Sequence, residues 1–268
     1  MRIIVLSLIL FCCGTCPITA QSDYIVTTPS TQEIPVGEEK QFIKNNFPLQ
    51  PLCKWTPGMK FMFIPSGRDM FLPTLLVYET EKGADNSVLK HKILTFAGYE
   101  EKSQELSNDM SYSTRLIFEC DGEKYYYEIK NTRPDEICEK NPRAYINGLV
   151  NLKDVDTAKD LLTGRKIYVQ SDMAQVDDAN SYSGYREVSI PVNTEATITA
   201  IGVGSQSYPV KIIFQDSQGH SYYLEVALSR TNSGMDVSDF QAEKKMRYFP
   251  NAISFSSKKS GNLETLKD

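Results

Sequence analysis

Alternating apolar and polar positions mark two stretches of the chain that repeat one another. They are FECDGEKYYYEI (residues 118–129) and FQDSQGHSYYLEV (residues 214–226). In each stretch, apolar residues recur at every second position on both sides of a short polar turn that contains glycine, which is typical of a β-hairpin. The pattern therefore predicts two related hairpins, one in each half of the chain.

The turns fix the expected pairing within each hairpin. The dipeptide Asp121-Gly122 suits a two-residue turn, because both of its positions require a positive φ, and it places Phe118 opposite Tyr125. A three-residue turn in the second hairpin places Phe214 opposite Tyr222. The two hairpins are thus expected to share one register.

Strand alternation then separates an inner face from an outer face. The residues expected in the core are Tyr125, Tyr127 and Ile129 in the first hairpin, and Tyr222, Leu224 and Val226 in the second. The other face carries Tyr126 with Glu128 in the first hairpin, and Tyr223 with Glu225 in the second. We therefore expect a tyrosine and a glutamate to point outward in both repeats.

A second repeated motif lies upstream of each hairpin. Gly58 and Lys60 precede an apolar run in the first half, and Gly164 and Lys166 do so in the second half. The distance from this glycine to the hairpin differs between the halves, which indicates one architecture with different loops. The sequence therefore predicts a duplicated small β-barrel.

Composition divides the chain into six segments. They are a signal peptide (1–20), an extended N-terminal arm (21–50), a first SH3-like barrel (51–140), a linker with a short helix (141–164), a second SH3-like barrel (165–230) and a C-terminal extension that is partly disordered (231–268). Residues 100–109 are charged and poor in strand formers, so we expect an exposed loop there. The linker helix is expected to have Asp154 as its N-cap and Gly164 at its end.

Five β-rich runs separated by Gly, Asn, Ser and Pro support a five-stranded barrel in the second half. They are RKIYVQ, REVSIPV, ATITAIGV, YPVKIIFQ and HSYYLEVAL, and AISFSS near the C-terminus is expected to add one edge strand. The predicted fold class is all-β, with two tandem small SH3-like five-stranded barrels joined by a short helix after a cleaved signal peptide.

The N-terminus is typical of a secretory signal. A basic start precedes an apolar run from Ile3 to about Phe11, which is too short to span a bilayer, and cleavage is expected after Ala20. The alternative is a lipoprotein anchor at Cys12, Cys13 or Cys16, although the residues before these cysteines fit the usual small-residue preference poorly. No other segment could form a transmembrane helix, so we expect an exported protein in the periplasm, at the cell surface or in the medium.

Charge and cysteine content extend this interpretation. The net charge of −5 argues against nucleic acid as a partner. Removal of the signal leaves Cys53, Cys120 and Cys138, an odd number. Cys120 shares the inward parity of Phe118 and is expected to be a buried free thiol. Cys53 precedes the first strand and Cys138 follows the last, and because these ends meet in a small barrel, we predict a disulfide between them.

Few residues could support catalysis. The only histidines, His91 and His220, are expected to lie on the surface. An acid/base hydrolase would need a carboxylate pair, and the candidates are Glu128, Glu225, Asp177 and Asp178. Glu128 and Glu225 belong to separate repeats, which disfavours this function. We therefore predict a protein with no catalytic residues and no cofactor.

A cation site is a weak alternative use of the acidic residues. Asp172, Asp177, Asp178 and Asn180 lie close together in the sequence and carry the oxygen ligands that hard cations prefer. Their spacing matches no EF-hand loop, and a polar loop without a metal is the favoured interpretation.

The strongest binding signal is aromatic. Tyr182, Tyr185, Tyr126 and Tyr223 could stack on sugar rings or grip a proline-rich peptide, because tyrosine offers rigid area and a hydroxyl. Tyrosines are also frequent on half-buried strands, and these residues could instead fill the contact between the barrels. Trp55 is expected to pack in the core of the first barrel.

Several longer motifs resemble a group of secreted proteins from Bacteroidetes. They are WTPGMKFMFIPS, LVNLKDVDTAKDLLTGRKIYVQS, DDANSYSGYREVSIP, IGVGSQSYPVKIIF and VALSRTNSGM, and they extend from Trp55 to Met235. The resemblance implies two consecutive SH3-like barrels and export in a diderm bacterium. It implies no catalytic residue.

These observations favour a non-catalytic binding or interaction module. Its expected ligand is an extracellular or periplasmic glycan, cell-wall fragment or peptide. The alternative is a structural component of an envelope assembly with a protein partner, and an acid/base hydrolase ranks last. The fold alone does not discriminate among these functions.

Overall fold

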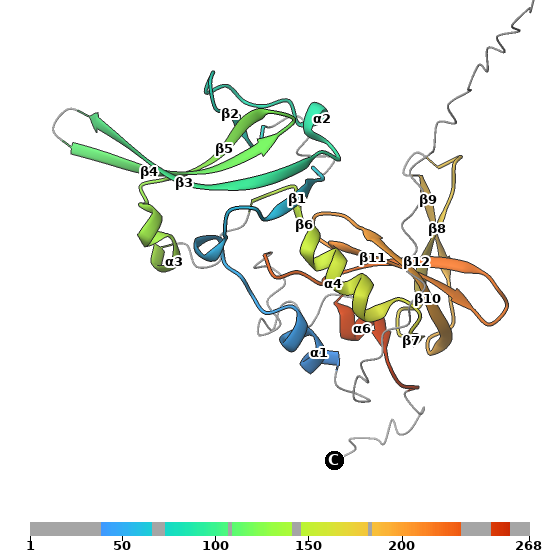
Figure 1. The fold of residues 1–268 in the computed structure, drawn as a ribbon. Coiled ribbons are helices and arrows are strands. Elements are labelled where there is room, and N and C mark those ends of the chain that lie inside the picture. Colours follow the sequence, from blue (N-terminus) through green and yellow to red (C-terminus); the bar gives the residue numbers. More distant parts are fainter. Residues whose placement is uncertain are drawn as a thin grey trace, which may run out of the picture.

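The computed structural model of the chain describes residues 39–65, 73–106, 109–140, 146–181, 184–231 and 248–257. These residues are mostly β-strand and form two antiparallel sheets, one of six strands and one of seven (Figure 1). No helix within these ranges is both long and apolar enough to cross a membrane. The predicted signal peptide and most of the N-terminal arm lie outside the described residues.

The first unit is the six-stranded sheet with the helices that pack on it. Its elements are η1 (Leu52–Lys54), β1 (Lys60–Phe63), β2 (Leu76–Val77), α2 (Asn86–Leu89), β3 (Ile93–Leu106), β4 (Asp109–Cys120), β5 (Glu123–Lys130), η3 (Pro134–Glu136), α3 (Ile137–Lys140) and β6 (Leu149–Asn151). The strand order in the sheet is β6-β1-β3-β4-β5-β2.

The second unit is the seven-stranded sheet with its own helices. Its elements are α1 (Glu39–Asn46), α4 (Leu152–Leu162), β7 (Lys166–Val169), β8 (Met173–Asp177), β9 (Tyr185–Ser189), β10 (Thr194–Val203), β11 (Val210–Asp216), β12 (Ser221–Val226), α6 (Phe249–Ala252) and β13 (Ile253–Ser254). The strand order is β13-β7-β10-β11-β12-β8-β9.

The two strand orders coincide once β9 is set aside. β6, β1, β3, β4, β5 and β2 correspond in turn to β13, β7, β10, β11, β12 and β8. The irregularity in β3 between Phe96 and Gly98 also has its counterpart in β10, between Ile198 and Ala200. The duplication expected from the sequence is therefore present in the topology of the sheets.

The repeated glycine upstream of each hairpin has the same structural role in both units. The backbone N–H of Gly58 donates to the carbonyl of Phe96 at 2.8 Å, and that of Gly164 donates to the carbonyl of Ile198 at 2.8 Å. Both glycines have a positive φ, 93° and 79°, which glycine adopts at little cost. Each glycine thus joins the start of the first strand to the bend in the second strand.

The predicted hairpin registers are confirmed. Phe118 lies opposite Tyr125, and Phe214 lies opposite Tyr222. The turn residues Asp121 and Gly122 have φ values of 51° and 85°, as a two-residue turn of this kind requires.

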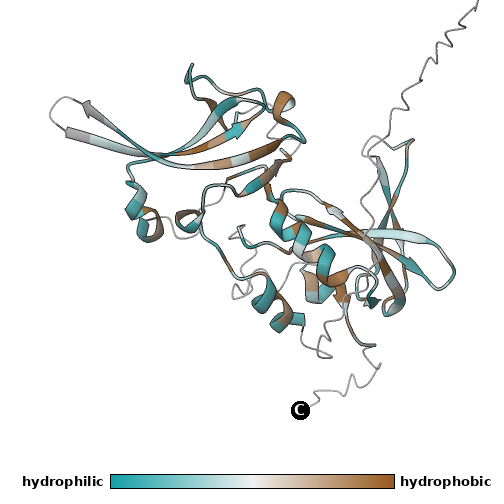
Figure 2. Ribbon diagram, viewed as in Figure 1, coloured by the Kyte–Doolittle hydropathy of each residue, from teal (hydrophilic) through white to brown (hydrophobic). Residues whose placement is uncertain are grey.

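Each unit has its own hydrophobic core. In the first core, Trp55 stacks on Phe61 with ring centroids 4.5 Å apart and meets the edge of Phe96 at 5.8 Å. Trp55 therefore packs in the core, as expected from the sequence. In the second core, Phe214 and Phe249 are fully buried. Apolar residues accordingly line both sheets (Figure 2).

The N-terminal arm is not extended where the structure describes it. Residues 39–46 form α1, and Phe42, Ile43 and Phe47 are buried in the core of the second unit. These apolar residues recur at helical spacing, so a helix buries them on one side while its lysines stay in water. The prediction of an extended arm with little core was wrong for this part.

The predicted loop at residues 100–109 is also different in the structure. β3 continues to Leu106 and β4 begins at Asp109, and the two strands pair throughout this region. Glu100 lies opposite Arg115, for example. Backbone hydrogen bonds hold such a ribbon, so polar and charged side chains can face water on it without opening the pairing.

The last strand of each sheet comes from outside the predicted barrel boundaries. β6 lies in the predicted linker, and β13 lies in the predicted C-terminal extension, as the edge strand expected there. The linker helix α4 begins one turn earlier than expected, because Asn151 and not Asp154 is its N-cap and accepts from the N–H of Lys153 at 3.1 Å.

The predicted disulfide is present in the structure. Cys53 and Cys138 are bonded, with their Cα atoms 5.3 Å apart and a sequence separation of 85. The bond joins η1 to α3 at the ends of the first unit. Cys120 is a buried free thiol, and burial raises its pKa, which disfavours the reactive thiolate.

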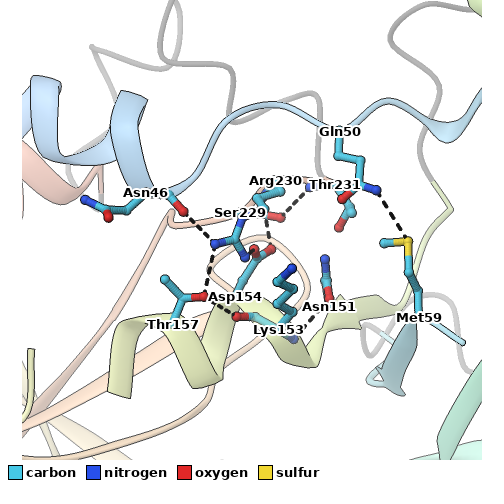
Figure 3. A network of polar contacts seen from close by, with 10 residues as sticks. All are labelled: Asn46, Gln50, Met59, Asn151, Lys153, Asp154, Thr157, Ser229, Arg230 and Thr231. Carbon is cyan, nitrogen blue, oxygen red and sulfur yellow. Dashed lines mark hydrogen bonds and ion pairs between the residues drawn. The ribbon is translucent and has the colours of Figure 1, made fainter. Parts of the chain in front are cut away.

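A buried ion pair lies where the two units meet (Figure 3). The side chain of Asp154 on α4 is fully buried and accepts from the backbone N–H of Arg230 at 2.9 Å and from its guanidinium at 2.8 Å. The same guanidinium donates to the carbonyl of Asn46 at 2.6 Å and to the hydroxyl of Thr157 at 3.0 Å. Arg230 therefore binds α4 and the end of α1 together.

Gln50 carries this connection into the first unit. Its backbone N–H donates to the carbonyl of Arg230 at 2.6 Å, and its own carbonyl accepts from the indole N–H of Trp55 at 3.1 Å. A second link between the units joins Gln206 to Asn147 at 2.9 Å. The segment from α1 to η1 thus contacts both units, and Arg230 is hydrogen-bonded to it at Asn46 and Gln50.

Burial raises the pKa of Asp154 to about 6, against the attraction of Arg230. The charged carboxylate is thus less stable in the protein than in water, and its contribution to stability falls as the pH rises from 3.8, the ordinary value, through about 6. Such a pair stabilises one arrangement of its neighbours more than it stabilises folding itself.

Asp154→Ala leaves the guanidinium of Arg230 buried without its carboxylate. We expect the free energy of unfolding to fall by about 3–5 kcal/mol, as for other broken buried pairs, measured by urea denaturation. Removing both charges in Asp154→Leu/Arg230→Met should cost less than the single change. Glu195→Ala, which breaks an exposed ion pair with Lys166 at 2.7 Å, is the control and should cause no measurable loss. A single-variant loss equal to that of the control would contradict this role.

Removing the disulfide frees the ends of the first unit in the unfolded chain. Cys53→Ser/Cys138→Ser should lower the free energy of unfolding by about 2–4 kcal/mol. Thermal unfolding with and without reductant provides the measurement. Reductant should destabilise the natural protein and leave the double variant unchanged, whereas equal sensitivity of both proteins would refute the expectation.

Candidate binding face

A cation lies over a tyrosine on the outer face of each hairpin, the face opposite the core. The guanidinium carbon of Arg115 is 4.2 Å from the ring centre of Tyr126 in the first unit. The ammonium nitrogen of Lys211 is 3.6 Å from the ring centre of Tyr223 in the second unit. Both distances are within the range of cation–π attraction.

The two cations occupy equivalent positions. Arg115 lies opposite Glu128 across β4 and β5, and Lys211 lies opposite Glu225 across β11 and β12. The repeat therefore contains a cation, a tyrosine and a glutamate on one face in both copies. We call the residues around Arg115 the first outer cluster and those around Lys211 the second outer cluster.

The first outer cluster is closed. Arg115 is only 5% exposed, and its guanidinium donates to Glu81 at 2.6 Å. Tyr78 meets the edge of Tyr126, with ring centroids 6.2 Å apart, and its hydroxyl donates to Glu100 at 2.7 Å. Protein groups therefore surround the cation.

The pKa shifts agree with this closed arrangement. The hydrogen bond from Arg115 lowers the pKa of Glu81, and a second hydrogen bond from Lys102 at 3.0 Å acts in the same direction. The hydrogen bond to Glu100 raises the pKa of Tyr78. Glu81 thus stays ionised and the phenol of Tyr78 stays protonated near neutral pH, which are the states that hold the cluster together.

The second outer cluster is more open. The side chain of Lys211 is 25% exposed and pairs with Asp177 at 3.7 Å, and the side chain of Asp177 is itself 85% exposed. Tyr185 on β9 meets the edge of Tyr223, with ring centroids 6.5 Å apart, and is half-buried. Lys211 thus lies over the ring of Tyr223, which in turn contacts the half-buried ring of Tyr185.

Gln175 adds a polar group to the same face. It lies opposite Tyr223 across β8 and β12 and is only 3% exposed. Within the part of the chain that the structure describes, its side-chain oxygen has no hydrogen-bond partner. Buried acceptors are normally satisfied, so this oxygen is suited to receive a donor from outside the described residues.

Two of the tyrosines expected to point outward are buried. Tyr126 is 2% exposed and Tyr223 is 7% exposed. β2 continues the sheet beyond β5, and β8 continues it beyond β12, so neighbours on the outer face cover both rings. Their expected exposure was wrong, because the alternation pattern does not reveal an added strand.

The other candidate aromatic residues have different outcomes. Tyr185 lies on the outer face of β9, opposite Asp177. Tyr182 lies outside the described residues. The structure therefore brings Tyr185 and Tyr223 together and separates them from Tyr126, which belongs to the other unit.

The acidic candidates do not converge. The Asp178 carboxylate accepts from the N–H of Asn180 at 3.0 Å within its own turn, while Asp177 faces Lys211. Asp172 is exposed before β8. In the described ranges, no three His, Cys, Asp or Glu side chains are grouped as metal ligands.

The histidines and paired glutamates lie apart from one another. His91 and His220 are both exposed, as expected from the sequence, and His220 contacts Asp216 at 3.1 Å. Glu128 accepts from the hydroxyl of Ser113 at 2.8 Å in the first unit, and Glu225 lies in the second. The structure does not bring these two carboxylates to one site.

Sequence reasoning missed Arg115 and Lys211. They stand three positions before Phe118 and Phe214, the residues that align the two repeats. Extending that alignment toward the N-terminus would have identified a conserved charge between the copies, with arginine in one and lysine in the other.

Comparisons of the chain with protein-family models, curated proteins and solved structures give no match.

The two cations should contribute differently to stability. Arg115→Ala should lower the free energy of unfolding by about 2 kcal/mol, the value of a desolvated cation–π contact, and Lys211→Ala by about 0.5–1 kcal/mol, the value of an exposed one. Chemical denaturation of both variants provides the measurement, with Arg115→Lys as a control that keeps the charge. Equal losses for the two alanine variants would show that the clusters do not differ in this way.

Proposed function

We propose that this chain is an exported, non-catalytic binding protein built from two SH3-like barrels. Within each unit, the order β6-β1-β3-β4-β5 or β13-β7-β10-β11-β12 supports the proposal, since the last strand returns beside the first. Five-stranded barrels of the SH3-like type have this order. The resemblance to secreted tandem-barrel proteins of Bacteroidetes belongs to the same proposal.

Export is supported by two independent features. The N-terminal sequence has the pattern of a cleaved signal, and the first unit contains the disulfide between Cys53 and Cys138. Disulfides persist in oxidising compartments such as the periplasm and are rare in the cytosol. The proposed location is therefore the periplasm, the cell surface or the medium.

The proposed ligand site is the second outer cluster. The observation that carries it is the contrast between Lys211, which is partly exposed with a distant carboxylate, and Arg115, which is enclosed. The stability of the fold alone does not explain why Lys211 lies over a tyrosine while its carboxylate partner Asp177 is 3.7 Å away and exposed. An anionic ligand would complete its coordination.

The chemistry of the cluster favours a saccharide or peptide that carries a carboxylate. Lys211 supplies the positive charge, and Tyr185 offers a partly exposed ring for stacking. Cell-wall fragments combine both matching features, with sugar rings and peptide carboxylates. We therefore place them first among the glycan, cell-wall and peptide ligands.

Binding of residues 21–268 to glycans and cell-wall fragments tests this function. Tyr185→Ala/Lys211→Gln should weaken binding of the ligand by about tenfold or more, because a ring contact and a charge-assisted hydrogen bond are both lost. Calorimetric titration measures the affinity of each protein.

Lys166→Gln is the matched control. It removes an exposed lysine from the same unit, where it pairs with Glu195, and should leave affinity unchanged. Binding by the natural protein that the double variant retains would move the site elsewhere. No binding to any fragment would favour the alternative of a structural role in an envelope assembly.

A further inference from the structure

A polar pocket lies in the first unit and shares no residue with the second outer cluster. It has a volume of about 410 Å³ and is lined by Ser111, Tyr112, Asn131, Arg133, Glu136 and Lys140. The lining comes from the start of β4, from the turn after β5 and from η3 and α3, which lie beneath the β3–β4 ribbon (Figure 1). Every lining side chain carries a polar group.

Buried residues hold the floor of this pocket in place. Thr132 is 2% exposed, and its carbonyl accepts from the hydroxyl of Thr114 at 2.8 Å. Asn131 and Arg133, on either side, are exposed. Ile137 is buried in the core, and the next residue, Cys138, is tied to Cys53 by the disulfide. The pocket is therefore set on anchored backbone.

Arg133 lies over an aromatic ring. Its guanidinium carbon is 4.0 Å from the ring centre of Tyr112. The contact with Tyr112 restricts the guanidinium, whose planar N–H groups can donate two parallel hydrogen bonds to a carboxylate. This arrangement favours a planar anion.

The remaining charges refine the choice of ligand. Lys140 donates to one oxygen of Glu136 at 2.7 Å, and the N–H of Arg133 donates to the same oxygen at 3.0 Å. These bonds lower the pKa of Glu136, so it is ionised near neutral pH. The pocket therefore has two cations and one carboxylate, which disfavours dianions such as phosphate monoesters. The other carboxylate oxygen of Glu136 can accept a hydrogen bond from a ligand hydroxyl.

We propose that this pocket binds an acidic sugar of the hexuronic acid class. Arg133, supported by Lys140, receives the sugar carboxylate. Glu136, Ser111 and Asn131 provide hydrogen-bonding groups for the ring hydroxyls, which an all-polar lining suits better than an apolar peptide side chain. The site does not depend on the proposed function of the second outer cluster, because it shares no residue with it.

Titration of residues 21–268 with D-glucuronate tests the proposal, with D-glucose and glucose 6-phosphate as comparators. We expect saturable glucuronate binding with a Kd of about 1 mM, weaker glucose binding, and weaker glucose 6-phosphate binding. Arg133→Gln should weaken glucuronate binding by about tenfold or more. Nuclear magnetic resonance shifts of the protein provide the measurement and report folding in the same spectra.

Lys124→Gln is the matched control, because it removes an exposed lysine from the same unit, where it pairs with Glu119 at 3.8 Å. It should leave glucuronate affinity unchanged. Lys140→Gln, a change at an exposed helix position, provides a second test if Arg133→Gln misfolds. Absence of saturation, equal affinity for glucose 6-phosphate, or unchanged affinity in Arg133→Gln would each overturn the proposal.

Discussion

The buried pair of Asp154 and Arg230 constrains how the two units are connected. Arg230 follows the last strand of the β12 hairpin, Asp154 lies on the helix between the units, and Asn46 ends the N-terminal helix. One guanidinium thus fixes three segments that are remote in sequence. Because a buried ion pair is favourable only when both partners are in place, it favours one arrangement of these segments. The hydrogen bond from the Gln50 backbone N–H to the Arg230 carbonyl then links these segments to the first unit.

The shared strand order shows how a duplicated architecture can diverge without loss of fold. The glycine at the first strand, the bend in the second and the Phe–Tyr pair across the hairpin are kept in both units. These are the features that set register and curvature, and they depend on backbone geometry. The connection between first and second strands differs between the units, since it adds β2 and the short helix α2 in one unit and the β8–β9 hairpin in the other. Loops of this kind tolerate change because few backbone bonds depend on them.

Local patterns predicted local structure well and tertiary additions poorly. The pairing of Phe118 with Tyr125 followed from two turn residues, and the disulfide followed from where the strands begin and end. The burial of Tyr126 did not follow, because it depends on β2, a two-residue strand with no periodic signal. Asp154 was misread for a related reason. An acidic residue near a helix start resembles an N-cap in sequence, and only its distant partner Arg230 reveals another role.

The two outer clusters illustrate a general consequence of duplication. In the first unit, the guanidinium of Arg115 pairs with Glu81 and lies against two aromatic rings, so this cation stabilises the fold. In the second unit, lysine at the same position carries a compact charge with fewer fixed contacts, and its neighbour Asp177 extends into water. Replacing a fork of five donors by a single ammonium removes directional bonds while keeping the charge. Once one copy maintains a closed face, the other can lose some stability and keep an accessible charge, and a ligand site can then arise without a change of strand order.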